Sequence, residues 1–301
     1  MRKKHFLFAS VLALLCGSST LHAQDFKLTS SGYFKNQGVD VMAFDDIYPE
    51  GHQGGVCIIM NGHRVATNGD IRLEATPGQW QPVPKQLDRK LGDNSITATL
   101  CYPDSSRHLT GFNPMIYPDL HLIYTVNVES KGKNIEVTVD LDRPIPQEFI
   151  GKVGFNLEFF PGSLFGKPWI MDGQSGIFPQ QPNSPLMTTQ PNYLHTGNYH
   201  DGKKSLADMN KLIGKGYSPI VADDIISEPY AKGTKFTSRP DDPYNKVTIE
   251  SLSGDLQLFD GRMNHNNGWF VLRSNIKPGV TKGAVKWIIT PNVVADWMYQ
   301  P

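Results

Sequence analysis

Glu158 and Asp172 are the acidic residues whose surroundings could support acid–base chemistry. Glu158 lies in the phenylalanine-rich stretch 155–160, and burial among apolar side chains raises the pKa of a carboxyl group enough for proton transfer. Strand alternation explains the same residue differently, as the polar neighbour of Leu157 and Phe159. Glycosidic-bond cleavage needs carboxyl groups of this kind. One alternative is therefore a stand-alone hydrolase or isomerase that uses Glu158 or Asp172.

Contact with sugar rings is the second chemistry that the sequence indicates. Sugar rings have apolar C–H faces and polar rims, so their binding sites combine an aromatic plate with amide and carboxylate groups. Three tryptophans have such neighbours, although a tryptophan more often anchors a core or a loop. The predicted carbohydrate-binding residues are Trp80, Trp169, Asp172, Gln174, Gln180, Asn183, Asn267 and Trp269.

One local cluster of metal-ligand types is formed by Asp45, Asp46, Glu50 and His52. Carboxylates this close together could hold a hard cation, but the fixed spacing of a calcium loop is absent. A solvated loop between two strands explains the cluster better. We therefore expect no metal ion and no cofactor, and these four residues are the weak candidates for a metal site.

The elements that must position these residues are strands. Apolar and polar residues alternate over 121–129 and again over 135–142, around a turn at 130–133, which is the pattern of a half-buried antiparallel hairpin. A second hairpin is predicted over 246–250 and 256–259. Further strands are predicted at 38–44, 54–60, 63–67, 70–75, 95–101, 153–160, 269–276 and 284–290.

Many strands with hardly any helical pattern between them predict an all-β fold, a large antiparallel two-sheet β-sandwich. Residues 161–245 interrupt the rhythm with closely spaced glycines and prolines, so we expect a long Gly/Pro-rich loop tract there. The domain boundaries that follow are residues 24–295 for the sandwich and 296–301 for a C-terminal tail or linker.

The first 23 residues have the three parts of an export signal, a basic start at 2–4, an apolar run at 6–15 and a small residue, Ala23, before the cleavage point. We expect a signal peptide over 1–23 and a periplasmic or extracellular protein. An exported chain could join Cys57 to Cys101 in a disulfide, or both could be free and buried as small apolar residues.

The composition excludes some classes of partner. The chain has 29 basic and 29 acidic residues, and removal of the signal takes away basic residues only. The remaining 26 basic and 29 acidic residues leave no excess of positive charge to bind nucleic acid. No apolar run after the signal is long enough to span a membrane, and with 39% hydrophobic and 19% charged residues the chain can bury a sizeable core.

Long and unusual strings of residues occur at 38–46, 48–55, 61–70, 77–84, 139–146, 160–183 and 260–270. These strings resemble the N-terminal region of secreted family-9 glycoside hydrolases of Bacteroidetes. In that family this region precedes an immunoglobulin-like module and a helical barrel that cleaves β-glucans, and the barrel carries the catalytic carboxylates. The Asp-Ala-Gly-Asp type of motif of the barrel does not occur in this sequence.

The resemblance therefore implies an accessory role and transfers no catalytic residue. We expect a non-catalytic carbohydrate-binding module of polysaccharide degradation, whose partners are a polysaccharide or oligosaccharide such as a β-glucan and a catalytic domain. The alternatives are the stand-alone enzyme that uses Glu158 or Asp172, and a structural module that packs on a catalytic domain.

Overall fold

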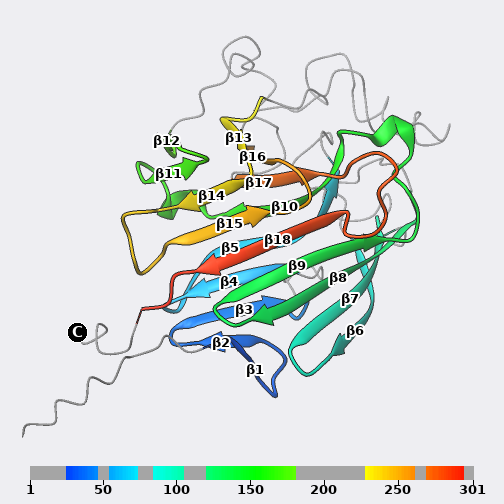
Figure 1. The fold of residues 1–301 in the computed structure, drawn as a ribbon, viewed down its shortest axis with the longest axis horizontal. Helices are drawn as coiled ribbons and strands as arrows, with labels where there is room; N and C mark the ends of the chain where they lie inside the picture. Colours follow the sequence, from blue (N-terminus) through cyan, green and yellow to red (C-terminus); the bar gives the residue numbers. More distant parts are fainter. Residues whose placement is uncertain are drawn as a thin grey trace, which may run out of the picture.

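The computed structural model describes residues 25–46, 54–73, 84–104, 120–180, 228–261 and 269–294. Two antiparallel sheets of nine strands each face one another, as Figure 1 shows. This confirms the predicted all-β, two-sheet sandwich.

The first sheet has the order β1-β2-β3-β4-β5-β10-β17-β16-β13. Its strands are β1 (Lys27–Leu28), β2 (Phe34–Asn36), β3 (Val39–Ala43), β4 (Val56–Met60), β5 (His63–Leu73), β10 (Val153–Phe159), β13 (Ala231–Gly233), β16 (Leu256–Asp260) and β17 (Phe270–Asn275). The sheet brings β5 and β17 to either side of β10, although about two hundred residues of chain separate them.

The second sheet has the order β12-β11-β14-β15-β18-β9-β8-β7-β6. Its strands are β6 (Lys85–Leu91), β7 (Ser95–Tyr102), β8 (Leu122–Lys131), β9 (Asn134–Leu141), β11 (Pro168–Met171), β12 (Gln174–Ile177), β14 (Lys235–Ser238), β15 (Val247–Ser251) and β18 (Val285–Pro291). Two short 3-10 turns, Gln147–Phe149 and Pro161–Ser163, flank β10.

The core between the sheets follows from period-two alternation. In β8 the residues Leu122, Tyr124, Val126 and Val128 are buried, and those between them are exposed or half-buried. Across the core, the ring of Phe155 in β10 meets Trp287 of β18 edge to face, with centroids 5.0 Å apart. The two sheets therefore share one hydrophobic core.

The strand β10 differs from β8, because all seven of its residues are buried. Phe155 and Phe159 face the second sheet, where Phe159 contacts Phe236 of β14 at 5.8 Å. Alternation then directs Asn156 and Glu158 to the opposite face of the first sheet. Polar side chains buried on that face need partners, and those partners define the candidate site.

Several expectations about the elements change in detail. The two strands predicted at 63–67 and 70–75 form the single strand β5, whose pairing with β10 shifts register between Asn156 and Glu158. The tract 161–245 contains more strand than its composition indicates, since β11, β12, β13 and β14 lie within its described residues. Cys57 in β4 and Cys101 in β7 belong to different sheets and are both free thiols.

Candidate functional site

Glu158 and the residues around it form the candidate site, on the face of the first sheet that points away from the second. In the register of β10 and β17, Glu158 lies opposite Val271 and Asn156 lies opposite Arg273. Paired residues on neighbouring strands share a face. We call this surface the β10 face; its residues are Asn68, Asn156, Glu158, Phe160, Trp269, Val271 and Arg273.

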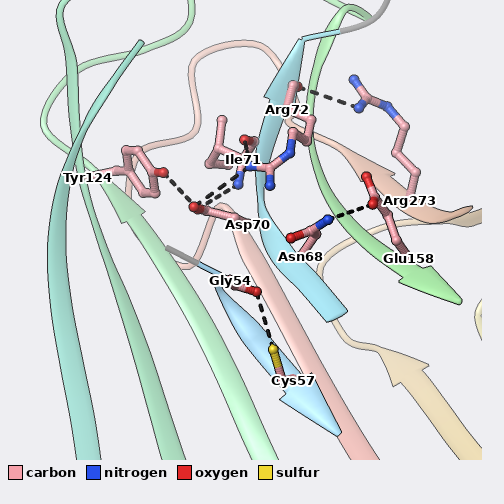
Figure 2. A network of polar contacts seen from close by, with 9 residues as sticks. All are labelled: Gly54, Cys57, Asn68, Asp70, Ile71, Arg72, Tyr124, Glu158 and Arg273. Carbon is pink, nitrogen blue, oxygen red and sulfur yellow. Dashed lines mark hydrogen bonds and ion pairs between the residues drawn. The ribbon is translucent and has the colours of Figure 1, made fainter. Parts of the chain in front are cut away.

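The carboxylate of Glu158 is 3% exposed and accepts a hydrogen bond from Asn68 Nδ2 at 2.7 Å. Asn68 has a φ of 54°, in the left-handed region that favours asparagine and glycine. Its backbone N–H donates to the carbonyl of Gly54 at 2.9 Å, which holds the side chain toward Glu158. Figure 2 shows this pair between β5 and β10.

Next to this pair, a fully buried group of polar side chains links the two sheets. Tyr124 of the second sheet donates its hydroxyl to Asp70 Oδ1 at 2.6 Å, and Arg72 Nη1 lies 3.8 Å from Asp70 Oδ2 (Figure 2). Burial, together with the charge of Asp70, raises the pKa of Tyr124 well above its usual value. Burial opposes the charge of Arg72, but attraction to Asp70 and Glu158 outweighs it and raises the pKa of Arg72.

Arg273 occupies the centre of the face at 1% exposure, and each of its three nitrogens donates to a protein acceptor. Nε bonds Asn275 Oδ1 at 2.7 Å, Nη1 bonds Asn156 Oδ1 at 2.7 Å, and Nη2 bonds the carbonyl of Lys152 at 2.5 Å. Gly154 leaves room for this guanidinium, because a Cβ there would lie 2.8 Å from Arg273 Cζ. The arginine therefore organises the strands around it.

An aromatic pair closes one end of the β10 face. Phe160 and Trp269 follow β10 and precede β17, and their ring centroids lie 4.1 Å apart at an interplanar angle of 69°. Both side chains are half-buried. Because Phe160 is two residues beyond Glu158 on an extended chain, the two side chains share a face at a spacing of about 7 Å.

Trp169 and Asp172 occupy a different place, the hairpin of β11 and β12. Trp169 is 7% exposed and its indole lies over Gly176, where a Cβ would come within 2.4 Å of the ring. Asp172 is exposed in the turn and accepts hydrogen bonds from the backbone N–H groups of Thr234 at 2.6 Å and Lys235 at 2.9 Å. The hydrogen bond from the N–H of Thr234 is the largest influence and lowers the pKa of Asp172. The N–H of Lys235 lowers it further, while burial acts to raise it.

The remaining predicted sugar contacts divide in two. Gln174 and Gln180 are exposed on or after β12. Trp80, Asn183 and Asn267 lie outside the described residues. Of the predicted residues that the structure describes, Glu158 and Trp269 lie on the β10 face, whereas Trp169, Asp172 and Gln174 lie together in the β11–β12 hairpin.

The acidic residues proposed as weak metal ligands contact arginines. Asp46 Oδ2 lies 2.5 Å from Arg64 Nη1, and Asp45 Oδ1 lies 4.0 Å from Arg89 Nη1. Glu50 and His52 fall outside the described residues. Over the described ranges no group of three His, Cys, Asp or Glu side chains is placed to hold a metal ion, and no helix there is long and apolar enough to cross a membrane.

Cys57 borders the site without the features of a nucleophile. Its sulfur lies 3.1 Å from Thr67 Oγ1. It also lies 3.3 Å from the carbonyl of Gly54, a contact that Figure 2 shows. Burial raises the pKa of the Cys57 thiol, although its contacts with Thr67 and Arg64 oppose the rise. A thiol of raised pKa is protonated at neutral pH and packs as a small apolar side chain.

Most of the β10 face escaped the sequence analysis. Asn68, Asp70 and Arg72 sit in a run that alternates with Ile71 and Leu73, and Arg273 alternates with Leu272. Charged residues that alternate with apolar ones normally face solvent, so their burial could not be foreseen. The sequence signal that could have indicated burial is an arginine within an apolar strand: Arg72 lies between Ile71 and Leu73, and Arg273 follows Phe270, Val271 and Leu272.

No family model and no curated protein matches the chain. Among solved structures, a galactose mutarotase related enzyme from Lactobacillus acidophilus matches with a TM-score of 0.35 and 9% identity, over 86% of this chain and 96% of that one. The Slr1438 protein from Synechocystis matches with a TM-score of 0.35 and 10% identity, over 89% and 96%. TM-scores this low do not establish a common fold, and they carry no argument about what this chain does.

Proposed function

We propose that this protein binds carbohydrate at the β10 face. The observation that carries the proposal is the half-buried pair Phe160 and Trp269 beside the carboxylate–amide pair Glu158 and Asn68. An aromatic plate can cover the C–H face of a sugar ring, while a carboxylate and an amide take its hydroxyls. These four side chains come from three strands of one sheet, so a rigid framework holds them in place.

The finer part of the proposal concerns the biological setting. The resemblance of strings such as 61–70 and 139–146 to the N-terminal region of family-9 glycoside hydrolases supports an accessory, non-catalytic role in polysaccharide breakdown. In this role the exported protein holds a glycan such as a β-glucan and works with a catalytic domain. We assign Asp172 no part in this binding, because it lies in the turn between β11 and β12 of the other sheet, where two backbone N–H groups hold its carboxylate.

Affinity electrophoresis tests the proposal. Soluble polysaccharides in a native gel should retard the mature protein, and Trp269→Ala should weaken the retardation about tenfold because the ring face is lost. Ile177→Ala, which removes an exposed side chain on β12 of the other sheet, is the matched control and should migrate like the wild type. No retardation by any glycan would contradict the proposal.

A second candidate function is favoured by the burial of Glu158 at 3% exposure, since a buried carboxyl group is suited to proton transfer. If the protein is a stand-alone hydrolase or isomerase, sugar release or anomer exchange is detectable with the wild type and is lost in Glu158→Gln. If it is an accessory module, the wild type shows neither activity while it still binds glycan. The two assays on the same preparation separate the two functions.

A further inference from the structure

Resting on the proposed function, we infer that the side-chain oxygen of Asn68 is an acceptor for a sugar hydroxyl, and that the β10 face selects uncharged sugars over anionic ones. The bond to Glu158 fixes the orientation of the Asn68 amide. Carboxylate oxygens only accept hydrogen bonds, so the amide nitrogen must be the atom that lies 2.7 Å from Glu158 Oε2. The amide oxygen then points away from Glu158.

This oxygen, Asn68 Oδ1, is buried and has no hydrogen-bond partner within the part of the chain that the structure describes. A buried acceptor without a donor destabilises the fold, so native proteins keep one where a ligand or an ordered water supplies the donor. Because the oxygen can only accept, the ligand must offer a donor, and a hydroxyl group does so.

The backbone fixes the position of this oxygen before any ligand arrives. Asn68 has a left-handed φ, and a close contact holds the backbone on each side of its side chain. Its own N–H donates to the carbonyl of Gly54, and the next residue, Gly69, packs against Val56. A Cβ on Gly69 would lie 2.6 Å from Val56 Cβ, so the strands are as near as glycine permits. A preorganised acceptor loses little entropy when a ligand binds.

The charged groups at the β10 face determine whether a neutral or an anionic sugar binds there. Recognition of an acidic sugar would need a cation with donors to spare, usually an arginine fork. Here Arg273 and Arg72 are only 1% and 3% exposed, so neither guanidinium is presented to a ligand. Each nitrogen of Arg273 already donates to the protein, and Arg72 Nη1 lies between the carbonyl of Ile71 and the carboxylate of Asp70. A carboxylate at Asn68 Oδ1 would instead place one hydrogen-bond acceptor against another, and such contacts disfavour binding.

Matched pairs of glycans test the inference with the wild-type protein. Each pair has one backbone and differs in a carboxyl group, such as cello-oligosaccharides and their C6-oxidised forms, or β-1,4-mannan and β-1,4-polymannuronate. Titration calorimetry should show the neutral member of the bound pair at least about tenfold tighter than the acidic one. Equal or tighter binding of the acidic member overturns the inference and leaves carbohydrate binding intact, whereas no binding by any glycan overturns both.

Variants then locate the selectivity. Asn68→Gly keeps the left-handed backbone without strain, removes the acceptor, and should weaken neutral-glycan binding about tenfold. The matched control is Asn61→Gly. Asn61 lies in the turn between β4 and β5 and also has a positive φ, 56°, but its amide donates to the carbonyl of Tyr244. The control should bind like the wild type. Unchanged affinity in Asn68→Gly overturns the inference, and if that variant does not fold, the glycan pairs still decide.

Discussion

At the scale of single residues, the buried hydrogen bond from Tyr124 to Asp70 is the contact on which most depends. The tyrosine comes from the second sheet and the aspartate from the first, so this buried bond joins the two sheets. Asp70 also forms an ion pair with Arg72, and its Oδ1 accepts a hydrogen bond from the backbone N–H of Ile71 at 2.7 Å. The contact thereby connects the core to the strand that carries Asn68.

Tyr124→Phe tests this contact. Removal of the hydroxyl leaves a buried carboxylate short of a donor, so the free energy of unfolding should fall by about 1–3 kcal/mol in urea denaturation. Thr125→Ala on the solvent side of the same strand is a control and should cost less than about 1 kcal/mol. A loss for Tyr124→Phe no larger than that of the control would contradict the assignment.

The same tyrosine predicts a dependence on pH. Burial raises the pKa of Tyr124 on folding above its ordinary value of about 10, so the neutral form is favoured in the folded state. The stability from this shift is fully present below pH 10 and is lost as pH rises through the folded pKa. The difference in unfolding free energy between wild type and Tyr124→Phe should shrink above about pH 10. A difference that stays constant to pH 11.5 or so would argue against the shift.

Asp172 makes a contrasting prediction at the residue scale. Its pKa is lowered on folding, chiefly by the N–H of Thr234, so its contribution to stability is present above the unfolded pKa and is lost as pH falls through the folded one. Because the group is exposed, the effect is small. Asp172→Asn should reduce stability slightly at neutral pH, lose that difference at strongly acid pH, and leave glycan binding unchanged. Loss of binding in this variant would make Asp172 a ligand contact.

At the scale of elements, β5 and β10 decide the geometry of the site. The register between them shifts beside Asn156 and Glu158, at the level where Gly69 packs on Val56 and forms an isolated bridge to Gly55. The shift allows Asn68 to take a left-handed φ and to reach Glu158. An irregularity of this kind re-aims a side chain next to a functional surface.

Gly69→Ala should therefore damage both stability and binding. Its Cβ would lie 2.6 Å from Val56 Cβ and 3.0 Å from the Val56 carbonyl, which forces the strands apart at a cost of about 1–3 kcal/mol. Gly162→Ala is the control, since a Cβ there meets nothing within 4 Å. Denaturation and affinity electrophoresis on both variants measure the effects; a Gly69→Ala protein as stable as Gly162→Ala would show that the contact tolerates a methyl group.

The sequence predicts the elements well where alternation is strict and poorly where it fails. The alternation predicts the hairpin of β8 and β9 almost to the residue, because its apolar side chains, apart from the exposed Ile123, all face the core. Short strands such as β11 and β12 carry few periodic positions, so their pairing depends on neighbours distant in sequence. The candidate site was only partly predicted, since Glu158 and Trp269 were identified whereas Asn68 and Arg273 became visible only through the order of strands.

At the scale of the whole molecule, the two sheets depend on one another. Trp287 of the second sheet is fully buried, contacts Phe155, and donates its indole N–H to Ser274 Oγ at 3.0 Å, and both of those residues belong to the first sheet. With the bond of Tyr124 to Asp70, the core holds polar as well as apolar contacts between the layers. Such a molecule is expected to unfold as one unit.

Trp287→Phe tests this cooperativity. The smaller ring leaves a void and Ser274 without its donor, so stability should fall by about 2–4 kcal/mol. Far-ultraviolet and near-ultraviolet circular dichroism should still report a single coincident transition, shifted to lower denaturant. Two separated transitions, in the variant or in the wild type, would mean that the sheets fold independently.

The most direct test of glycan binding at the β10 face is a two-dimensional NMR titration of the isotopically labelled protein with a glycan. The account predicts that the indole N–H signal of Trp269 and the side-chain amide signals of Asn68 shift together with the same affinity. The indole N–H signals of the buried Trp169 and Trp287 should not shift. Shifts confined to signals away from the β10 face, or no shift at glycan concentrations that retard the protein in a gel, would contradict it.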